Sequence, residues 1–342
     1  MFNKKSILIT GGTGSFGKKF SEVLLHRFKP KKIVIYSRDE FKQSEMQKKI
    51  FSNKNTKVRY FIGDVRDFER LKLAMSDIDT VVHAAALKQV PATEYNPFEA
   101  VKTNIIGAQN VIDASLQTDV SKVIALSTDK AAAPINLYGA SKLTADKLFV
   151  SANNYSGSSK KVFSVVRYGN VMGSRGSVIP LFLATRKNNI LQITDKRMTR
   201  FNITLEEGVN FVINCSKIMW GGEIFIPKIP SYKILDVAQA IAPKAKIKFI
   251  GLRPGEKIHE EMITVPDSPN SVEFKNYYVI LPNHKFLDWD IKKFLKKDKK
   301  DIGKFCKYGF SYSSENNKNF LTIKMLKKLI FTDVLGGEVL KS

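Results

Sequence analysis

Cysteine is scarce in this sequence of 342 residues. Cys215 and Cys306 lie far apart, and neither belongs to a CxxC motif or to a His/Cys cluster with metal-ligand spacing. A chain of this length buries a core large enough to need no disulfide. We therefore expect a reducing compartment, which we take to be the cytoplasm, and we expect no metal site.

The sequence also lacks long apolar runs. No run reaches the roughly 18 residues that a membrane span requires. The apolar part of the opening segment MFNKKSILITGG is only a handful of residues and ends in glycines, which is not the pattern of a signal peptide. With 43% hydrophobic and 26% charged residues, the composition is that of a globular protein. We expect no membrane insertion.

Acidic residues are few beside basic ones. The chain has 56 Lys and Arg against 32 Asp and Glu, a net charge of +24. Such a charge is compatible with a nucleic acid, an anionic surface or an anionic small substrate as a partner. The lysines are spread along the whole chain, and the denser run at residues 292–301 is typical of a solvated helix face. Nothing beyond charge supports a nucleic-acid partner, and we expect none.

Short apolar runs alternate with amphipathic segments in the first half. Amphipathic helices are expected at Phe16–Phe28, Phe68–Met75 and Pro97–Gln117. The runs are too apolar for half-exposed strands, so they predict parallel strands covered on both faces. This alternation predicts an α/β fold with a doubly wound parallel Rossmann sheet. The expected strands are Ser6–Thr10, Lys32–Ser37, Val58–Asp64, Thr80–Ala86, Lys122–Thr128 and Lys161–Gly169.

The alternation breaks down after residue 169. We expect residues 1–169 to form the Rossmann domain, with some later segments returning to it. Residues 170–282 are richer in glycine and turns, and they predict a smaller mixed substrate-binding region. Residues 283–342 form a lysine-rich C-terminal extension, which we expect to lie outside the active site.

A glycine-rich turn follows the first expected strand. The sequence TGGTGSFG at residues 10–17 stands between a strand and a helix. Its spaced glycines permit a tight turn, close approach of a pyrophosphate and close packing of helix on sheet. The helix N-terminus attracts the anion. The expected cofactor contacts in this turn are Gly11, Thr13, Gly14, Ser15, Phe16 and Gly17.

The tip of the second strand bears on the choice of dinucleotide. Ser37 and Arg38 stand where an NAD site would place a carboxylate, and Lys42 follows one helical turn later. A cationic tip suits a 2′-phosphate, so NADP is the preferred cofactor. Asp39 could still reach the ribose, which keeps NAD as the alternative. Asp64, after the third strand, would face the adenine, or would act instead as a helix N-cap.

The stretch LSTDKAAAPINLYGASK, residues 126–142, carries the expected chemistry. Tyr138 and Lys142 lie one turn apart on a helix that starts after the fifth strand. A nearby lysine cation lowers the pKa of a tyrosine, which can then act as a base toward a sugar hydroxyl. A simple alcohol dehydrogenation needs only these two residues. The pair Asp129 and Lys130 therefore indicates a further step.

From residue 3 to 282 the sequence resembles the extended short-chain dehydrogenase/reductases. Within them it is most similar to the inverting UDP-N-acetylglucosamine 4,6-dehydratases that begin pseudaminic acid biosynthesis. We find no such likeness after Pro282. The motifs that carry the resemblance are ITGGTGSFG, YSRDE, GDVRD, HAAALK, STDK, NLYGASK, VRYGNVMGSRGSV, MTRF, GGEIFIPKIPS and GLRPGEKIHE.

The resemblance implies a role for each residue of this stretch. Tyr138 would remove the 4-OH proton while C4 passes hydride to the nicotinamide, and the 4-ketone would acidify C5. Water would then leave across C5–C6, with Asp129 as the acid. Lys130 would be the base, provided that its pKa is lowered enough to leave it neutral. Hydride returns to C6 and C5 is inverted, which gives a UDP-2-acetamido-2,6-dideoxy-L-arabino-hexos-4-ulose.

Rival functions stay open. Retaining dehydratases resemble this site but carry Asp-Glu in place of Asp129-Lys130, and a UDP-hexose 4-epimerase has no use for the pair. A protein that binds the dinucleotide without turnover would usually lack Tyr138 or Lys142.

The resemblance also implies further contacts. Thr128 would bind the sugar near O4, and Lys88 would meet the nicotinamide ribose or the substrate. Asn104 would have a structural or a catalytic role. Ala133, Gln89 and Asn202 depart from the usual pattern, which bears on substrate preference. We expect a homo-oligomer of two or more copies. The other expected cofactor contacts are Val65, Ala84, Ala85 and Ala86, and the expected contacts to UDP-N-acetylglucosamine are Lys88, Asn170, Val178, Thr194, Arg253 and Glu256.

Overall fold

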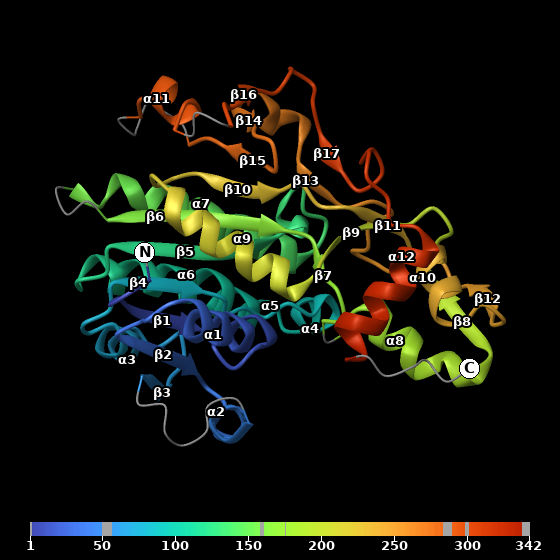
Figure 1. The fold of residues 1–342 in the computed structure, drawn as a ribbon, viewed down its shortest axis with the longest axis horizontal. Helices are drawn as coiled ribbons and strands as arrows, with labels where there is room; N and C mark the ends of the chain where they lie inside the picture. Colours follow the sequence, from blue (N-terminus) through green and yellow to red (C-terminus); the bar gives the residue numbers. More distant parts are fainter. Residues whose placement is uncertain are drawn as a thin grey trace.

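The computed structural model describes residues 2–49, 57–157, 161–174, 176–282, 289–297 and 301–336. In these residues the largest sheet has ten strands in the order β16-β14-β15-β10-β6-β5-β4-β1-β2-β3 (Figure 1). The seven strands from β10 to β3 run parallel, and β15, β14 and β16 are each antiparallel to their neighbour. Their bounds are β1 Ser6–Thr10, β2 Lys32–Ser37, β3 Val58–Ile62, β4 Thr80–His83, β5 Lys122–Thr128, β6 Val162–Tyr168, β10 Ile224–Pro227, β14 Ser271–Glu273, β15 Tyr277–Ile280 and β16 Lys304–Phe305.

Helices cover both faces of this sheet. On one face α3 packs on α6 and α6 packs on α7, whereas on the other face α1 packs on α9 (Figure 1). The expected doubly wound α/β fold is therefore confirmed. The helix bounds are α1 Ser15–Arg27, α2 Glu40–Lys49, α3 Phe68–Ala74, α4 Val90–Tyr95, α5 Pro97–Ala100, α6 Gly107–Leu116, α7 Leu137–Ser151 and α9 Leu205–Ile218.

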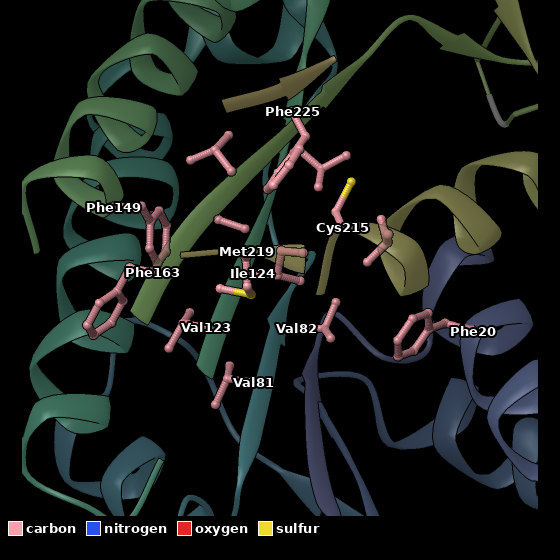
Figure 2. Packing of buried hydrophobic residues seen from close by; sticks show 14 of the residues in the cluster. Phe20, Val81, Val82, Val123, Ile124, Phe149, Phe163, Cys215, Met219 and Phe225 are labelled. Atoms are coloured by element: carbon pink, nitrogen blue, oxygen red, sulfur yellow. The ribbon is translucent and has the colours of Figure 1, made fainter. Parts of the chain in front are cut away.

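The core lies between the sheet and these two helical layers. Figure 2 shows Phe149 of α7 on one side of the central strands and Phe20 of α1 on the other. Val82 and Val123, on neighbouring parallel strands, fill the space between them and are fully buried. Because both faces of the central sheet are covered, strands such as β1 and β2 are buried along almost their whole length, which is why their apolar runs could be recognised in the sequence.

The strands agree closely with the prediction at their starts and less closely at their ends. β1, β2 and β5 have the expected bounds, and β6 is one residue shorter at each end. β3 ends at Ile62 and β4 at His83, so Asp64 and Ala84–Ala86 lie in loops beyond the sheet. These loops are where a parallel sheet places its ligand contacts.

The helix expected at Pro97–Gln117 is broken. It consists of α5, a π-helical segment Val101–Ile106 and α6. Asn104 lies in this π-helical segment, and its side-chain amide bonds to both backbone groups of Leu87. A π-helical turn widens the helix and is often found at functional sites, and here it directs Asn104 toward the loop after β4.

A second, smaller core lies beside the carboxyl end of the sheet. Its strands form separate small sheets, β11-β9-β7 and β12-β8, and its helices are α8, α10 and α12 (Figure 1). The bounds are β7 Asn170–Val171, α8 Val178–Thr185, β8 Ile190–Ile193, β9 Thr199–Ile203, β11 Ser231–Lys233, α10 Ile234–Ile241, β12 Lys246–Phe249 and α12 Ile323–Leu329.

The C-terminal residues contribute to both cores. Leu326 of α12 is fully buried in the second core, where α12 packs on α10. β17 (Tyr312–Ser313) pairs with β13 (Glu261–Ile263), and β16 lies at the edge of the main sheet. Residues on both sides of position 282 therefore take part in each core, whereas the described residues before position 170 contribute only to the first core.

The lysine-rich run at residues 292–301 lies only partly within the described residues. α11 (Ile291–Leu295) exposes Lys292 and Lys293, as a solvated helix face does, but it buries Phe294. Lys297 lies 3.8 Å from the centroid of the Phe294 ring. Among the described residues, no helix combines the length and the apolar character needed to cross a bilayer.

Candidate active site

A pocket of about 1050 Å³ runs along the carboxyl ends of β1, β2, β4 and β5 and reaches the second core. It is lined by all of the site residues expected from the sequence except Asp129, which is fully buried behind it. Ligands bind at this edge in doubly wound sheets, where the strand order reverses. The structure therefore brings residues from widely separated motifs to one cavity.

The glycine-rich turn packs more closely against neighbouring backbone than a residue with a side chain could. Gly11 has φ +64, and a Cβ there would lie 2.9 Å from backbone atoms of Ala85. A Cβ on Gly17 would lie 2.4 Å from the carbonyl oxygen of Gly12. α1 begins at Ser15 directly after this turn, and its first N–H groups face the pocket edge as an anion site. This cradle fits a dinucleotide pyrophosphate.

Two cations stand at the tip of β2, each beside a carboxylate. Arg38 lies 3.5 Å from Asp64 and is more than half exposed, and Lys42 lies 2.5 Å from Asp39. The hydrogen bond from Lys42 lowers the pKa of Asp39. Asp64 does not cap α3, because Asp67 accepts the N-cap hydrogen bond. Its alternative role as a cap is therefore wrong, and its side chain stays at the pocket.

The loop after β4 is held by hydrogen bonds from Asn104 of the π-helical segment. Asn104 Oδ1 accepts from the Leu87 N–H at 2.8 Å, and its amide donates to the Leu87 carbonyl and to Ser141 Oγ, both at 2.9 Å. Asn104 does not line the pocket. Its contacts are structural, and they hold Lys88 at the pocket wall.

Tyr138 and Lys142 come from the first turns of α7, whose start is capped by Asn136 Oδ1. Burial raises the pKa of Tyr138 to about 12, against the lowering effects of Lys130 and of a hydrogen bond with Thr128. Burial also lowers the pKa of Lys142, against the carboxylate of Asp146. A lysine cation does act to lower the pKa of Tyr138, as expected, but the net change is a rise, because burial outweighs the neighbouring cation.

Lys130 donates toward three acceptors. Its Nζ lies 3.1 Å from Asp129 Oδ1, 3.4 Å from Asn170 Oδ1 and 3.2 Å from Glu260 Oε1. Burial acts to lower the pKa of Lys130, but the carboxylates of Asp129 and Glu260 outweigh it and raise the pKa. The resting side chain is therefore an ammonium, and the condition set for Lys130 as a neutral base is not met in this state.

The pKa of Asp129 is also raised, which favours its neutral form. The residue is 0% exposed, and burial raises the pKa of its carboxyl against the effect of Lys130. Its Oδ1 accepts from Thr128 and Lys130, and its Oδ2 has no hydrogen-bond partner among the described residues. A buried oxygen without a donor favours a proton on it. Asp129 is thus suited to carry a proton next to Lys130.

Apart from Lys88, which follows β4, the expected substrate residues lie on the second core's side of the pocket. Thr194 Oγ1 donates to Glu256 Oε1 at 3.5 Å, and Val178 is the first residue of α8. Arg253 lies on an exposed loop at the pocket mouth. Asn170 lies deeper, at Lys130. The site thus has an outer cationic part and an inner part that contains the Asp129–Lys130 pair.

Sequence reasoning missed Glu260 and found Arg200 only as part of the motif MTRF. Arg200 is buried, donates to three backbone carbonyls, and lies 3.7 Å from Glu260 Oε1. Lys257 donates to the Ala132 carbonyl at 2.7 Å. These residues belong to MTRF and GLRPGEKIHE, so the motifs were found, but nothing local in them indicates contact with Lys130.

Comparison with known proteins places the chain in a family. The model of the family described as "Polysaccharide biosynthesis protein" matches residues 7–282. The chain belongs to this family. It is 58% identical over 332 residues to a UDP-N-acetylglucosamine 4,6-dehydratase (inverting) of Campylobacter jejuni, covering 96% of this chain and 98% of that protein. Such coverage includes residues beyond Pro282, where the sequence alone gave no likeness.

Two other proteins are similar to this chain at lower sequence identity. A protein of Rickettsia bellii named UDP-glucose 4-epimerase is 42% identical over 354 residues, with 100% of both chains covered. The X-ray structure of Pen from Bacillus thuringiensis has a TM-score of 0.86 and 40% identity, covering 97% of this chain and 98% of that one. The family and fold expected from the sequence are confirmed.

Proposed function

We propose that this member of the polysaccharide biosynthesis protein family is an NADP-dependent UDP-N-acetylglucosamine 4,6-dehydratase that inverts C5. The observation that carries the proposal is the placement of Lys130 beside Tyr138 at one pocket, with Asp129 hydrogen-bonded to Lys130 directly behind the pocket wall. The relative that is 58% identical supports it, since it is named for this activity. Tyr138 alone would serve any alcohol oxidation, whereas the pair serves an elimination.

NADP would be held along the N-terminal half of the pocket. The turn at residues 11–17 fits its pyrophosphate, and Arg38 and Lys42 are placed for a 2′-phosphate. When bound, the cofactor supplies a hydride acceptor and returns the hydride later. Tyr138 lines the same pocket, and the positive charge of an oxidised nicotinamide bound close to it would favour its tyrosinate form. Asp39, paired to Lys42, keeps NAD as the alternative.

Oxidation at C4 would begin at Tyr138. Its hydroxyl hydrogen-bonds to Thr128, and both line the pocket. We assign to Tyr138 the removal of the proton from the sugar 4-OH and to Thr128 the orientation of that oxygen. Lys142 lies one turn farther along α7, buried at the pocket wall, and would position the cofactor and the tyrosine.

Elimination would need a base at C5 and an acid at the 6-OH. In the resting site the Lys130 ammonium donates to Asp129 at 3.1 Å. Transfer of one proton along this hydrogen bond breaks an N–H bond and forms an O–H bond, and it gives a neutral amine and a neutral carboxylic acid. Burial favours this uncharged pair. Lys130 would then remove the C5 proton, and Asp129 would protonate the leaving hydroxyl.

The substrate diphosphate would bind at the outer part of the pocket. Arg253 offers a guanidinium fork for two phosphates, and Glu256 offers a carboxylate to the uridine ribose. Asn170, Thr194 and Val178 would contact the sugar end. The product would enter pseudaminic acid biosynthesis, and we assign the enzyme to the cytoplasm as a homo-oligomer that needs no nucleic acid and no membrane.

One experiment separates this function from its rivals. The purified protein is incubated with NADP and UDP-N-acetylglucosamine, and the products are followed by mass spectrometry and NMR. We expect a product lighter by one water, with C5 inverted. A product of unchanged mass would instead support the epimerase, the function for which the relative that is 42% identical is named. A dehydrated product with C5 retained would support a retaining dehydratase.

A further inference from the structure

Glu260 is buried at the inner end of the pocket. Its residue is 2% exposed and lines the pocket, and its Oε1 lies 3.2 Å from Lys130 Nζ and 3.7 Å from Arg200 Nε. Its Oε2 has no hydrogen-bond partner among the described residues. A buried carboxylate is costly unless cations compensate it, and here two cations do.

The charges around Lys130 come from several elements of the fold. Lys130 Nζ has two carboxylate partners, Asp129 and Glu260, and Arg200 lies between Glu260 and Glu256. Removing the charge of Glu260 would leave Lys130 with one carboxylate partner, which favours loss of a proton from Lys130. The titratable groups that act on or face Lys130 are Asp129, Tyr138, Lys88, Arg200, Tyr232, Lys257 and Glu260.

The backbone of Glu260 is fixed by the C-terminal part of the chain. Its N–H donates to Ser314 Oγ at 2.9 Å, and its carbonyl accepts from the Ser314 N–H at 2.7 Å. Ser314 Oγ also lies 2.7 Å from Thr199 Oγ1. Residues 312–314 thus anchor the segment that carries Glu260, although no described residue beyond Glu260 lines the pocket.

We propose that Glu260 is a positioning residue whose carboxylate holds the Lys130 ammonium at the pocket wall and sets the pH at which Lys130 gives up its proton. The inference deepens the proposed function and rests on it, because it is Lys130 that would exchange a proton with C5. Ser314 takes part indirectly, by fixing the Glu260 backbone.

The first test measures the proton on Lys130 without any turnover. The full-length protein is labelled briefly with acetic anhydride at a series of pH values at which circular dichroism shows it folded. Peptide mass spectrometry then gives labelling of Lys130 relative to the exposed Lys147. We expect Glu260→Gln to raise this ratio by about tenfold or more at a given pH, since a neighbouring charge commonly shifts a pKa by about 1–3 units.

Two variants control this test. Glu261→Gln removes a charge from the adjacent residue and should leave the ratio unchanged. Glu260→Asp keeps the charge and should return the ratio most of the way to the wild-type value. An unchanged ratio in a folded Glu260→Gln protein would overturn the proposal. If that variant fails to fold, Ser314→Ala decides: a raised ratio supports the proposal, and an unchanged ratio overturns it.

The second test measures the pH at which Lys130 loses its proton while the enzyme turns over. The pH dependence of solvent deuterium entry at C5 is compared between the wild type and Glu260→Gln. In the plot of deuterium entry against pH, we expect the rise that reports loss of the Lys130 proton to move to lower pH by about one unit or more. A purely structural role would lower the rate at every pH without moving this rise, and that result would contradict the proposal. If the wild type forms no dehydrated product, the proposed function fails, while the labelling test still reports on Glu260.

Discussion

The Arg167 guanidinium and the Asp146 carboxylate form a buried ion pair, with Arg167 Nη2 3.1 Å from Asp146 Oδ2. Ser127 Oγ donates to the same oxygen at 2.8 Å, and Arg167 Nη1 donates to the Met262 carbonyl at 3.0 Å. The pair therefore joins β5, β6, α7 and β13 directly behind Lys142, one turn away on α7.

Replacing Asp146 should destabilise the protein severely. Asp146→Ala leaves the Arg167 guanidinium buried without its counter-charge, which costs about 3–5 kcal/mol of unfolding free energy. Urea denaturation followed by circular dichroism measures this loss. Asp119→Ala, at an exposed position, serves as the control and should change stability by less than about 0.5 kcal/mol. A cost for Asp146→Ala no larger than that of the control would contradict the structural role of the pair.

Arg38 should discriminate between the two dinucleotides. Arg38→Ala removes a charge-assisted contact to a 2′-phosphate and should cost about 1–3 kcal/mol of NADP binding, with NAD binding nearly unchanged. Isothermal titration with each cofactor gives the comparison. Arg70→Ala, a neighbouring arginine that packs on Phe61 outside the pocket, should affect neither. Equal weakening of both cofactors would sink the 2′-phosphate assignment.

Tyr138→Phe and Lys130→Ala should stop the reaction at different steps. Without the Tyr138 hydroxyl no proton leaves the sugar 4-OH, so no NADPH should appear. Without the Lys130 amine the C4 oxidation remains possible, so NADPH should accumulate transiently and C5 should take up no deuterium from D₂O. Absorbance and NMR follow the two events. Normal turnover by Lys130→Ala would remove Lys130 from the elimination step.

Ala133 stands in a strained backbone conformation. Its φ is +42, a left-handed region in which glycine and asparagine are tolerated better than alanine. Ala133→Gly and Ala133→Asn should therefore stabilise the protein, by up to about 1 kcal/mol. Thermal denaturation measures the change. Ala132→Gly is the matched control, because Ala132 has extended backbone at φ −84 and should lose stability. Destabilisation by both Ala133 variants would contradict the claim that the backbone at Ala133 is strained.

His83 should make the folded state sensitive to acid. Burial, followed by the effect of Lys142, lowers its pKa from 6.5 to about 3. Between these values the unfolded chain binds a proton that the folded protein does not. The contribution of neutral His83 to the free energy of unfolding is therefore fully present above pH 6.5. It is lost as the pH drops toward 3, by up to about 1.4 kcal/mol per pH unit. His83→Gln should flatten this slope, and the exposed-site variant His26→Gln should not. Equal slopes in all three proteins would refute the assignment.

Features that depend on near neighbours in the chain could be predicted. The apolar runs gave β1, β2 and β5 their observed bounds, because each strand is buried on both faces. The spaced glycines identified the turn before α1 for the same local reason. The helix at residues 97–117 was predicted as continuous, because nothing in the local sequence indicates the π-helical turn or the contact of its Asn104 with the distant Leu87.

The protonation states at the site could not be predicted. The sequence placed Lys130 beside Asp129, but the second carboxylate, Glu260, comes from a remote part of the chain. The pKa of Tyr138 likewise depends on how deeply the folded protein buries it, and a four-residue spacing carries no information on burial. The side chains that line the pocket could be named from motifs, whereas their charges required the packing around them.

The pairing of β13 with β17 has a consequence for how the protein becomes functional during synthesis. Domains fold from the N-terminus as the chain leaves the ribosome, so the strands of the nucleotide-binding half can assemble early. Glu260, however, is anchored by Ser314. We therefore expect the inner end of the pocket to become ordered only after residues 312–314 have been added, later than the N-terminal strands assemble.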